Sequence, residues 1–316
     1  MELPTIVIDN GSLRRARHPI EAGGFVANWE DAENVWKHVF SELEAPVPLS
    51  HPILMTEPTH VANDQRQRLL SHVFESLSAP AYYTALPALL STYAANLPTA
   101  LVVDSGFAGT TTVPVYEHIP IRYHARRNDV SGQAIDDWLQ LTLMRDLGLE
   151  LQSSSVWEDA IRLLKFERCR VAGDFEEELM KWTRRRETGT ERPLGLWAGE
   201  ILLNPGILGL DTGGLQHDVF NTVRRCDQGL RERLYGNILL AGGNTMFTGF
   251  GNRLETCLKG IEEKGTKVNV LSPPNRAYSA WVGGSMLSEL ATFGNMCISR
   301  AEYEEVGPEI VNRKCL

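Results

Sequence analysis

The chain has 316 residues, 43% of them hydrophobic and 22% charged, with a formal net charge of −9 at pH 7. This length allows two domains around a large buried core, and the composition is typical of a soluble globular protein. The acidic charge excludes a general nucleic-acid binder, which needs a basic face, and no apolar run is long enough to span a bilayer. We therefore expect no direct nucleic-acid partner and no membrane partner.

The cysteines are odd in number and scattered, and no two have the spacing of metal ligands. They are Cys169, Cys226, Cys257, Cys297 and Cys315. Free thiols in a reducing compartment are the simplest interpretation, and Met1 leads into a strand instead of a signal peptide. We expect an intracellular protein.

The first part of the chain alternates predicted strands with predicted helices. We expect strands at residues 6–8, 52–56 and 82–86, and helices at residues 31–43, 65–77 and 87–95. Asn28 or Asp31 is the expected cap of the first helix, and Pro87 is compatible with a first helical turn. The alternation favours a parallel-rich α/β sheet.

Residues 101–117, LVVDSGFAGTTTVPVYE, have the pattern of a tight hairpin: strand, glycine-containing turn, strand. A glycine at positive φ would let backbone N–H groups converge on an anion, and Asp104 could hold a hydrated divalent cation. A plain β-turn, in which Asp104 caps its own backbone, fits the same residues.

Two other stretches repeat this pattern. The strand at residues 6–8 runs into DNG at 9–11, as the hairpin strand runs into DSG at 104–106, and a Gly-Gly turn at 242–243 follows a similar apolar run. Ligands of α/β folds sit at the carboxyl ends of strands. Two acidic strand ends and a glycine turn could therefore enclose one nucleotide between two domains.

The remaining elements complete a second unit. A third strand is expected at residues 119–126 and a charged loop at 184–189; an apolar stretch at 200–210 is broken by Pro205-Gly206. The other expected helices are 133–147, 155–172, 250–258, 279–292 and a short one within 299–316, and the other strands are 237–241 and 268–271.

Ordered stretches along nearly the whole chain are similar to actin sequences. They are PIE at 19–21, NWED at 28–31, DSG at 104–106, TVPVYE at 112–117, GGNTMF at 242–247, PPNRAYSAWVGGS at 273–285 and IVNRKCL at 310–316. The chain thus resembles a divergent actin-related protein. The resemblance implies the duplicated α/β fold of actin, hexokinase and the heat-shock-70 ATPase, with ATP or ADP and Mg²⁺ or Ca²⁺ in a central cleft between domains.

The resemblance also implies a division of the chain, with the first half truncated. Residues 1–94 with 279–316 resemble subdomain 1, residues 95–130 with 211–278 resemble subdomain 3, and residues 131–210 resemble a shortened subdomain 4. The hairpin with a phosphate-binding lysine and the small subdomain 2 are absent between about 12 and 18. This leaves the first strand at or near a sheet edge. A splice form or an incomplete gene model would leave the same gap.

The site residues follow from the resemblance position by position. The cofactor-binding positions are Asp9, Gly11, Ser12, Asp104, Ser105, Gly106, Lys165, Gly242, Gly243 and Asn244. Asp9 and Asp104 would hold the cation through water. Lys165 matches a residue near the base and ribose, but Phe166 replaces its acidic neighbour and Ala277 replaces a lysine at the other edge of the base. Weak binding and no binding both remain open, because the glycines also suit tight turns.

The catalytic positions depart from the family pattern. Pro87 stands where the family has the glutamine that orients the attacking water, Thr111 replaces a histidine and Phe107 an acidic residue. Phosphoryl transfer depends on positioning and charge stabilisation. We therefore expect no catalytic residues and a degenerate site without useful hydrolysis.

A partner groove is the last implied site. Its positions are Tyr93, Leu287, Leu290, Thr292 and Met296. In the family this apolar cleft receives amphipathic helices, a common recognition mode. Ordinary core at helical spacing is the alternative for some of these residues.

Taken together, these features predict a cytoskeletal actin-related protein in the cytoplasm, with a nuclear complex left open. We expect a non-polymerising structural or scaffold subunit of a larger complex, with other actin-family or scaffold proteins as partners. One alternative is a nucleotide-binding ATPase that forms filaments conditionally. Another is a truncated product that does not fold stably alone.

Overall fold

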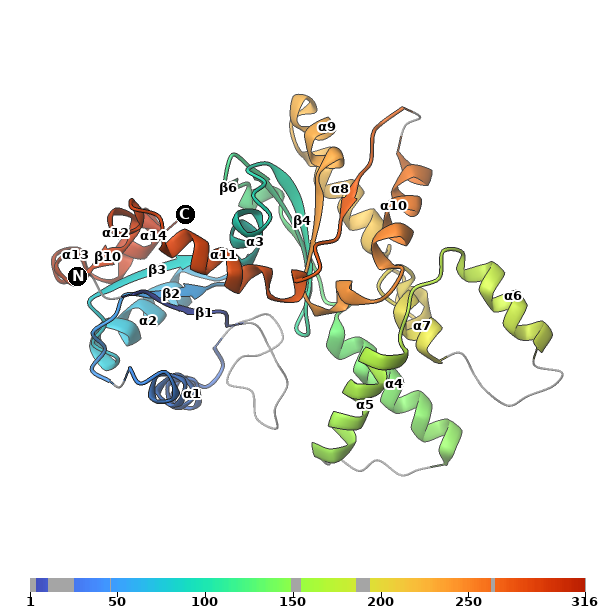
Figure 1. The fold of residues 1–316 in the computed structure, drawn as a ribbon, viewed down its shortest axis with the longest axis horizontal. Helices are drawn as coiled ribbons and strands as arrows, with labels where there is room; N and C mark the ends of the chain where they lie inside the picture. The colour runs from blue at the N-terminus through green and yellow to red at the C-terminus, as the bar shows by residue number, and fades with distance from the viewer. Residues whose placement is uncertain are drawn as a thin grey trace.

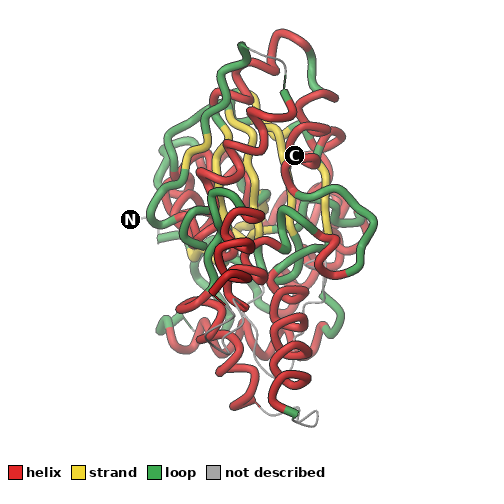
Figure 2. The backbone as a smooth tube through the Cα atoms, turned by 90° about the vertical axis from the view of Figure 1, so that its right-hand side faces the viewer, coloured by secondary structure: helices red, strands yellow, loops and turns green. Residues whose placement is uncertain are grey.

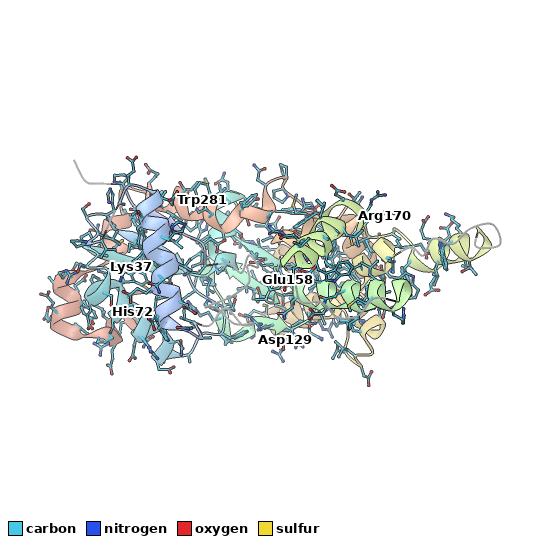
Figure 3. All side chains as sticks on the ribbon, turned by 90° about the horizontal axis from the view of Figure 1, so that it is seen from below. Lys37, His72, Asp129, Glu158, Arg170 and Trp281 are labelled. Carbon is cyan, nitrogen blue, oxygen red and sulfur yellow. The ribbon has the colours of Figure 1, made fainter. Side chains whose placement is uncertain are left out.

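The computed structural model describes residues 4–10, 26–45, 47–148, 155–185, 194–262 and 265–315 (Figure 1). It has the expected α/β class, with two sheets and helices packed around both (Figure 2). Viewed along the orthogonal direction, the half that carries Lys37 and His72 lies beside the half that carries Glu158 and Arg170 (Figure 3). None of the described helices has the length and apolar composition needed to cross a bilayer.

The first sheet has the order β1-β2-β3-β10. Its strands are β1 (Ile6–Ile8), β2 (Ile53–Thr56), β3 (Ala81–Ala85) and β10 (Ile298–Ser299). The first three are parallel, as predicted, and β10 pairs antiparallel with β3. Within the described chain β1 is an edge strand, as expected.

Helices from both ends of the chain surround this sheet. They are α1 (Trp29–Glu42), α2 (Asn63–Ser71), which continues as one π-helical segment (His72–Ser76), α3 (Pro87–Ala94), α11 (Ser279–Ser288), α12 (Phe293–Met296), α13 (Arg300–Val306) and α14 (Val311–Lys314). Of the two predicted caps of α1, the structure selects Asn28, whose Oδ1 accepts hydrogen bonds from the amides of Glu30 and Asp31.

The second sheet has the order β6-β5-β4-β8-β9, with β7 also paired to β5. Its strands are β4 (Ala100–Ser105), β5 (Thr110–Tyr116), β6 (Ile119–Pro120), β7 (Arg126–Asn128), β8 (Ile238–Ala241) and β9 (Val270–Leu271). The single strand expected at residues 119–126 is wrong. Pro120 has no N–H for the ladder, and a 3₁₀ turn (Arg122–His124) separates β6 from β7.

Seven described helices complete this half. They are α4 (Gly132–Leu147), α5 (Ser155–Arg168), α6 (Phe175–Arg185), α7 (Leu194–Glu200), α8 (Leu215–Arg225), α9 (Gln228–Gly236) and α10 (Phe250–Ile261). The predicted helix 155–172 ends early, because Arg170 and Val171 pair with Thr248. The sequence reasoning missed α6, which extends away from the body (Figure 1); part of the loop expected at 184–189 lies outside the described residues.

The strand β4 lies between two hydrophobic cores, one on each of its faces. Along β4, Ala100 and Val102 face the first core, which also contains β1–β3, α3 and α11, whereas Leu101 and Val103 face a second core with α8 and α10. This alternation is the two-residue period of a strand buried on both faces. The helices α3 and α11 pack against each other between the sheets (Figure 1).

Candidate functional site

A cleft of about 520 Å³ opens between the two halves, a volume within the range of small-molecule sites. It brings together the predicted positions Asp9, Asp104, Gly106, Lys165, Gly242, Gly243 and Asn244. Ser105 is fully buried beneath it, and Gly11 and Ser12 lie outside the described residues. Residues far apart in the sequence therefore line one cleft.

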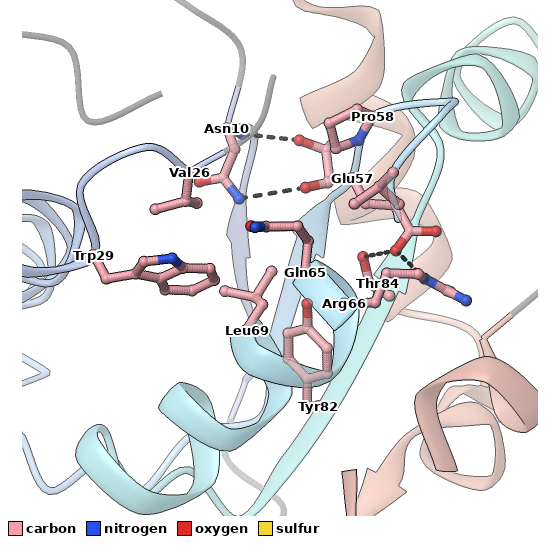
Figure 4. A pocket seen from close by; sticks show the side chains of 12 residues that line it. Asn10, Val26, Trp29, Glu57, Pro58, Gln65, Arg66, Leu69, Tyr82 and Thr84 are labelled. Carbon is pink, nitrogen blue, oxygen red and sulfur yellow. Dashed lines mark hydrogen bonds and ion pairs between the residues drawn. The ribbon is translucent and has the colours of Figure 1, made fainter. Parts of the chain in front are cut away.

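The carboxyl end of β1 forms one wall of the cleft. Thr56 donates from Oγ1 to Asp9 Oδ1 at 2.9 Å and accepts from the amide of Asn10 at 2.8 Å. The Asn10 side chain donates to the Thr56 carbonyl and accepts from Trp36 Nε1 at 3.2 Å. These bonds tie the strand end to β2 and α1 and orient the Asp9 carboxylate. Figure 4 shows the two bonds that Asn10 makes to β2.

The carboxyl end of β4 forms the opposite wall. Burial, and secondarily the negative charge of Asp9, raises the pKa of Asp104 to about 7. The two carboxylates repel each other across the cleft. A divalent cation bound between them would remove this repulsion, and carboxylate oxygens are ligands that such cations prefer. No cluster of three or more candidate metal ligands occurs among the residues whose placement is described.

Gly242 allows the third turn to approach this carboxylate. Its φ is +83°, and a Cβ atom at this position would lie 2.4 Å from Asp104 Oδ1 and 2.4 Å from the Ser105 carbonyl oxygen. Only glycine combines this conformation with this closeness. The positive φ predicted for the hairpin turn after Asp104 is thus found in the Gly-Gly turn instead.

The turn of the β4–β5 hairpin has a different construction from the one expected. Neither Gly106 nor Gly109 has a positive φ. The amide of Gly106 donates to the carbonyl of Gly109 at 3.0 Å, while the amide of Gly132 and Nδ2 of Asn244 donate to the carbonyl of Gly106. The turn is held by the N-terminus of α4 and by Asn244, so it needs no left-handed residue.

Lys165 faces the cleft with its charge already paired. Its Nζ lies 2.7 Å from Asp136 Oδ1 and donates to the carbonyl of Gly132 at 3.2 Å, and the side chain is 6% exposed. Asp136, on α4, was missed, since nothing in the sequence links it to Lys165. Phe166 is exposed beside it, with the Arg162 guanidinium 6.0 Å from the ring centre.

The three divergent catalytic positions also line the cleft. Pro87 begins α3, Phe107 lies in the hairpin turn and Thr111 lies in β5. At these positions the cleft presents no carboxylate, imidazole or side-chain amide. These three positions therefore contribute no acidic or basic side chain to the lining of the cleft.

Arginines at the cleft were not anticipated. Arg127 donates from Nη2 to the carbonyl of Ala108 at 2.8 Å, and its guanidinium group lies against Gly109. Arg276 donates to the carbonyl of Thr245, and burial lowers its pKa. Arg127 places a positive charge directly against the hairpin turn.

The predicted partner groove is only partly exposed. Leu287 is fully buried in the first core, so its side chain cannot contact a docked helix, whereas Leu290 is 44% exposed. Tyr93 stacks on His118 with ring centres 4.2 Å apart. Thr292 is exposed and Met296 partly buried. A helix-binding role for these four remains a prediction.

Comparisons with known proteins agree with this geometry. The actin family model matches residues 2–158 and 189–316. An actin-like protein of Neurospora crassa is 34% identical over 96% of this chain and 82% of its own length. A centractin of Schizosaccharomyces pombe is 32% identical over the same shares of the two chains. The chain therefore belongs to the actin family, with the duplicated actin-type fold.

Proposed function

We propose that this actin-related chain is a structural subunit of a larger assembly, with a cleft that holds a nucleotide weakly and does not hydrolyse it. One observation carries the proposal: a single cleft contains Asp9 and Asp104 together with Pro87, Phe107 and Thr111. Actin-family proteins generally bind a nucleotide with a divalent cation. The first pair suits a hydrated cation, whereas the three substitutions leave no side chain to orient an attacking water.

The residues present determine what a bound nucleotide would meet. Asp9 and Asp104 would hold a cation that neutralises phosphate charge. Arg127, which pairs only with the exposed Asp129 among the described residues, would add a positive charge at the hairpin turn. Lys165, satisfied by Asp136, would shape the wall without supplying a free charge. We further propose actin-family or scaffold proteins as partners in a cytoplasmic, cytoskeletal setting, by similarity to the named relatives.

Calorimetry with ATP and Mg²⁺ tests the binding step. We expect micromolar binding by the wild-type protein and none by Asp104→Ala, because one of the two carboxylates is lost. Asp211→Ala removes the same charge from an exposed loop and should bind like wild type. Absence of binding by the wild-type protein would contradict the nucleotide-holding role.

Phosphate release and sedimentation test the rest of the proposal. We expect no steady phosphate release and no pelleted filaments in magnesium and salt. Release that Asp104→Ala abolishes, together with filaments, would instead establish the alternative of a conditionally polymerising ATPase.

A further inference from the structure

A buried carboxylate bridges the two halves at the cleft wall. Glu57 directly follows β2, its side chain is 3% exposed, and it lines the cleft. Its Oε2 accepts from Arg66 Nε at 2.8 Å and from Thr84 Oγ1 at 3.3 Å (Figure 4). Its Oε1 accepts from Arg122 Nη2 at 2.5 Å. Both carboxylate oxygens are therefore used, by residues from different parts of the fold.

Arg66 extends this contact to the C-terminal segment. It lies on α2 and is 8% exposed. Its Nη1 donates to Asn312 Oδ1 at 3.1 Å, and its Nη2 donates to the backbone carbonyl of Cys315. One guanidinium group thus holds Glu57 on one side and the C-terminal backbone on the other.

Arg122 reaches Glu57 from the opposite half. It begins the 3₁₀ turn between β6 and β7 of the second sheet, whereas Glu57 and Arg66 belong to the half built on the first sheet. In the described fold the chain passes between the halves at residues 95–99 and 272–278. The Glu57–Arg122 ion pair therefore joins the halves at a third place, apart from both crossings.

We propose that Arg122, Glu57 and Arg66 form a clamp that sets the closed position of the cleft and couples it to the C-terminal segment. Opening the cleft removes Arg122 from a buried carboxylate, which is costly because the charge loses a partner. Arg66 then compensates Glu57 alone and holds the Cys315 carbonyl less firmly. Coupling of this kind is reciprocal, so a partner that displaces the C-terminal segment loosens the cleft.

Alkylation of Cys315 by iodoacetamide, followed by peptide mass spectrometry on the full chain without nucleotide, tests the clamp. Cys315 is fully buried, so its alkylation rate reports local opening of the C-terminal segment. We expect Arg122→Met to raise this rate about tenfold. Arg122→Lys should restore a near wild-type rate by keeping the cation. Nucleotide is absent, so the result is independent of whether the cleft binds ATP.

Arg126→Met is the matched control. Arg126 is 31% exposed, against 29% for Arg122, and pairs with Asp218 at 3.2 Å inside the second half. It should leave the Cys315 rate unchanged. Cys226, buried in the second half, controls for global unfolding in the same sample.

Three results would overturn the clamp. The first is an unchanged alkylation rate of Cys315 in Arg122→Met. The second is a rise in the alkylation rate of Cys226 equal to that of Cys315. The third is a full additional increase when Arg122→Met is combined with Glu57→Gln, because residues acting in one chain of contacts are not additive.

Discussion

Asp9 and Asp104 each follow an apolar strand and precede a small polar residue and a glycine, but the structure gives them different surroundings. Asp9 follows a short edge strand, is exposed and is held by Thr56. Asp104 is the last residue but one of β4, which lies between β5 and β8, and burial raises its pKa to about 7. Because an interior strand is covered on both sides, its terminal carboxylate loses more water than that of an edge strand. A repeated motif thus predicts where a side chain stands but not how strongly its charge is solvated.

The largest expected effect concerns the close packing that is particular to the β4 end. Gly242→Ala should destabilise the protein by about 3 kcal/mol, because a Cβ atom would meet Asp104 and the Ser105 backbone at a positive φ. Gly243→Ala is the matched control: its Cβ meets nothing within 4 Å, and we expect a change within about 0.5 kcal/mol. Urea denaturation measures both. Equal losses would show that the β4 end is no more tightly packed than its neighbourhood.

A smaller effect concerns the pH dependence of stability, in which Asp104 and Asp9 should differ. The folded-state pKa of Asp104 is raised from 3.8 to about 7, so between these values the native state keeps a proton that the unfolded state has released. The contribution of Asp104 to wild-type stability should therefore be fully present below pH 3.8 and be lost as the pH rises through about 7. Asp104→Asn should remove this decline and be more stable than wild type at pH 8 by about 2 kcal/mol.

Asp9→Asn provides the contrast for that measurement. Asp9 is exposed and is the minor cause of the Asp104 shift, so this variant should keep most of the wild-type decline. Unfolding curves recorded without nucleotide or divalent cation, from pH 4 to 8, measure how the free energy of unfolding of each variant changes with pH. Identical pH slopes in the two variants would contradict the difference in solvation.

The smallest effect tests the hydrogen bonds that hold the β1 end. Thr56→Val removes the contacts to Asp9 and the Asn10 amide, and should destabilise the protein by about 1 kcal/mol and speed amide exchange in β1 but not in β4. Thr222→Val removes a buried hydroxyl pair with Thr112 in the second half. It should cost a similar amount while leaving exchange in β1 unchanged. Faster exchange in both strands of Thr56→Val would mean that the two ends are not independent.

Much of the fold was predictable because its signals are local. The strands β1–β4 and β8 and the helices α1, α3 and α4 were predicted within one or two residues, since buried positions recur with the period of each element. The failures have equally local causes. Pro120 broke a predicted strand, and Asp174, whose Oδ1 accepts from the amide of Glu177, begins the unpredicted α6.

Some residues of the candidate site were likewise predictable from the sequence, and others were not. Asp9, Asp104 and Gly242 could be named from sequence, because strand ends and glycine turns mark the edge of an α/β sheet where ligands bind. Arg127 could not, because its position against Gly109 depends on the pairing of β5 with β7.

Periodicity, turn residues and matching motifs were sufficient to establish the α/β class, the order of most elements and the actin resemblance. The tertiary structure alone supplied the partners of the buried charges. Lys165 meets Asp136, and Glu57 meets both Arg66 and Arg122. The raised pKa of Asp104 also follows from the tertiary structure alone. Helix and strand patterns arise from neighbours in the chain, whereas the energy of a charge depends on solvent exclusion and on groups that only packing brings within a few ångströms.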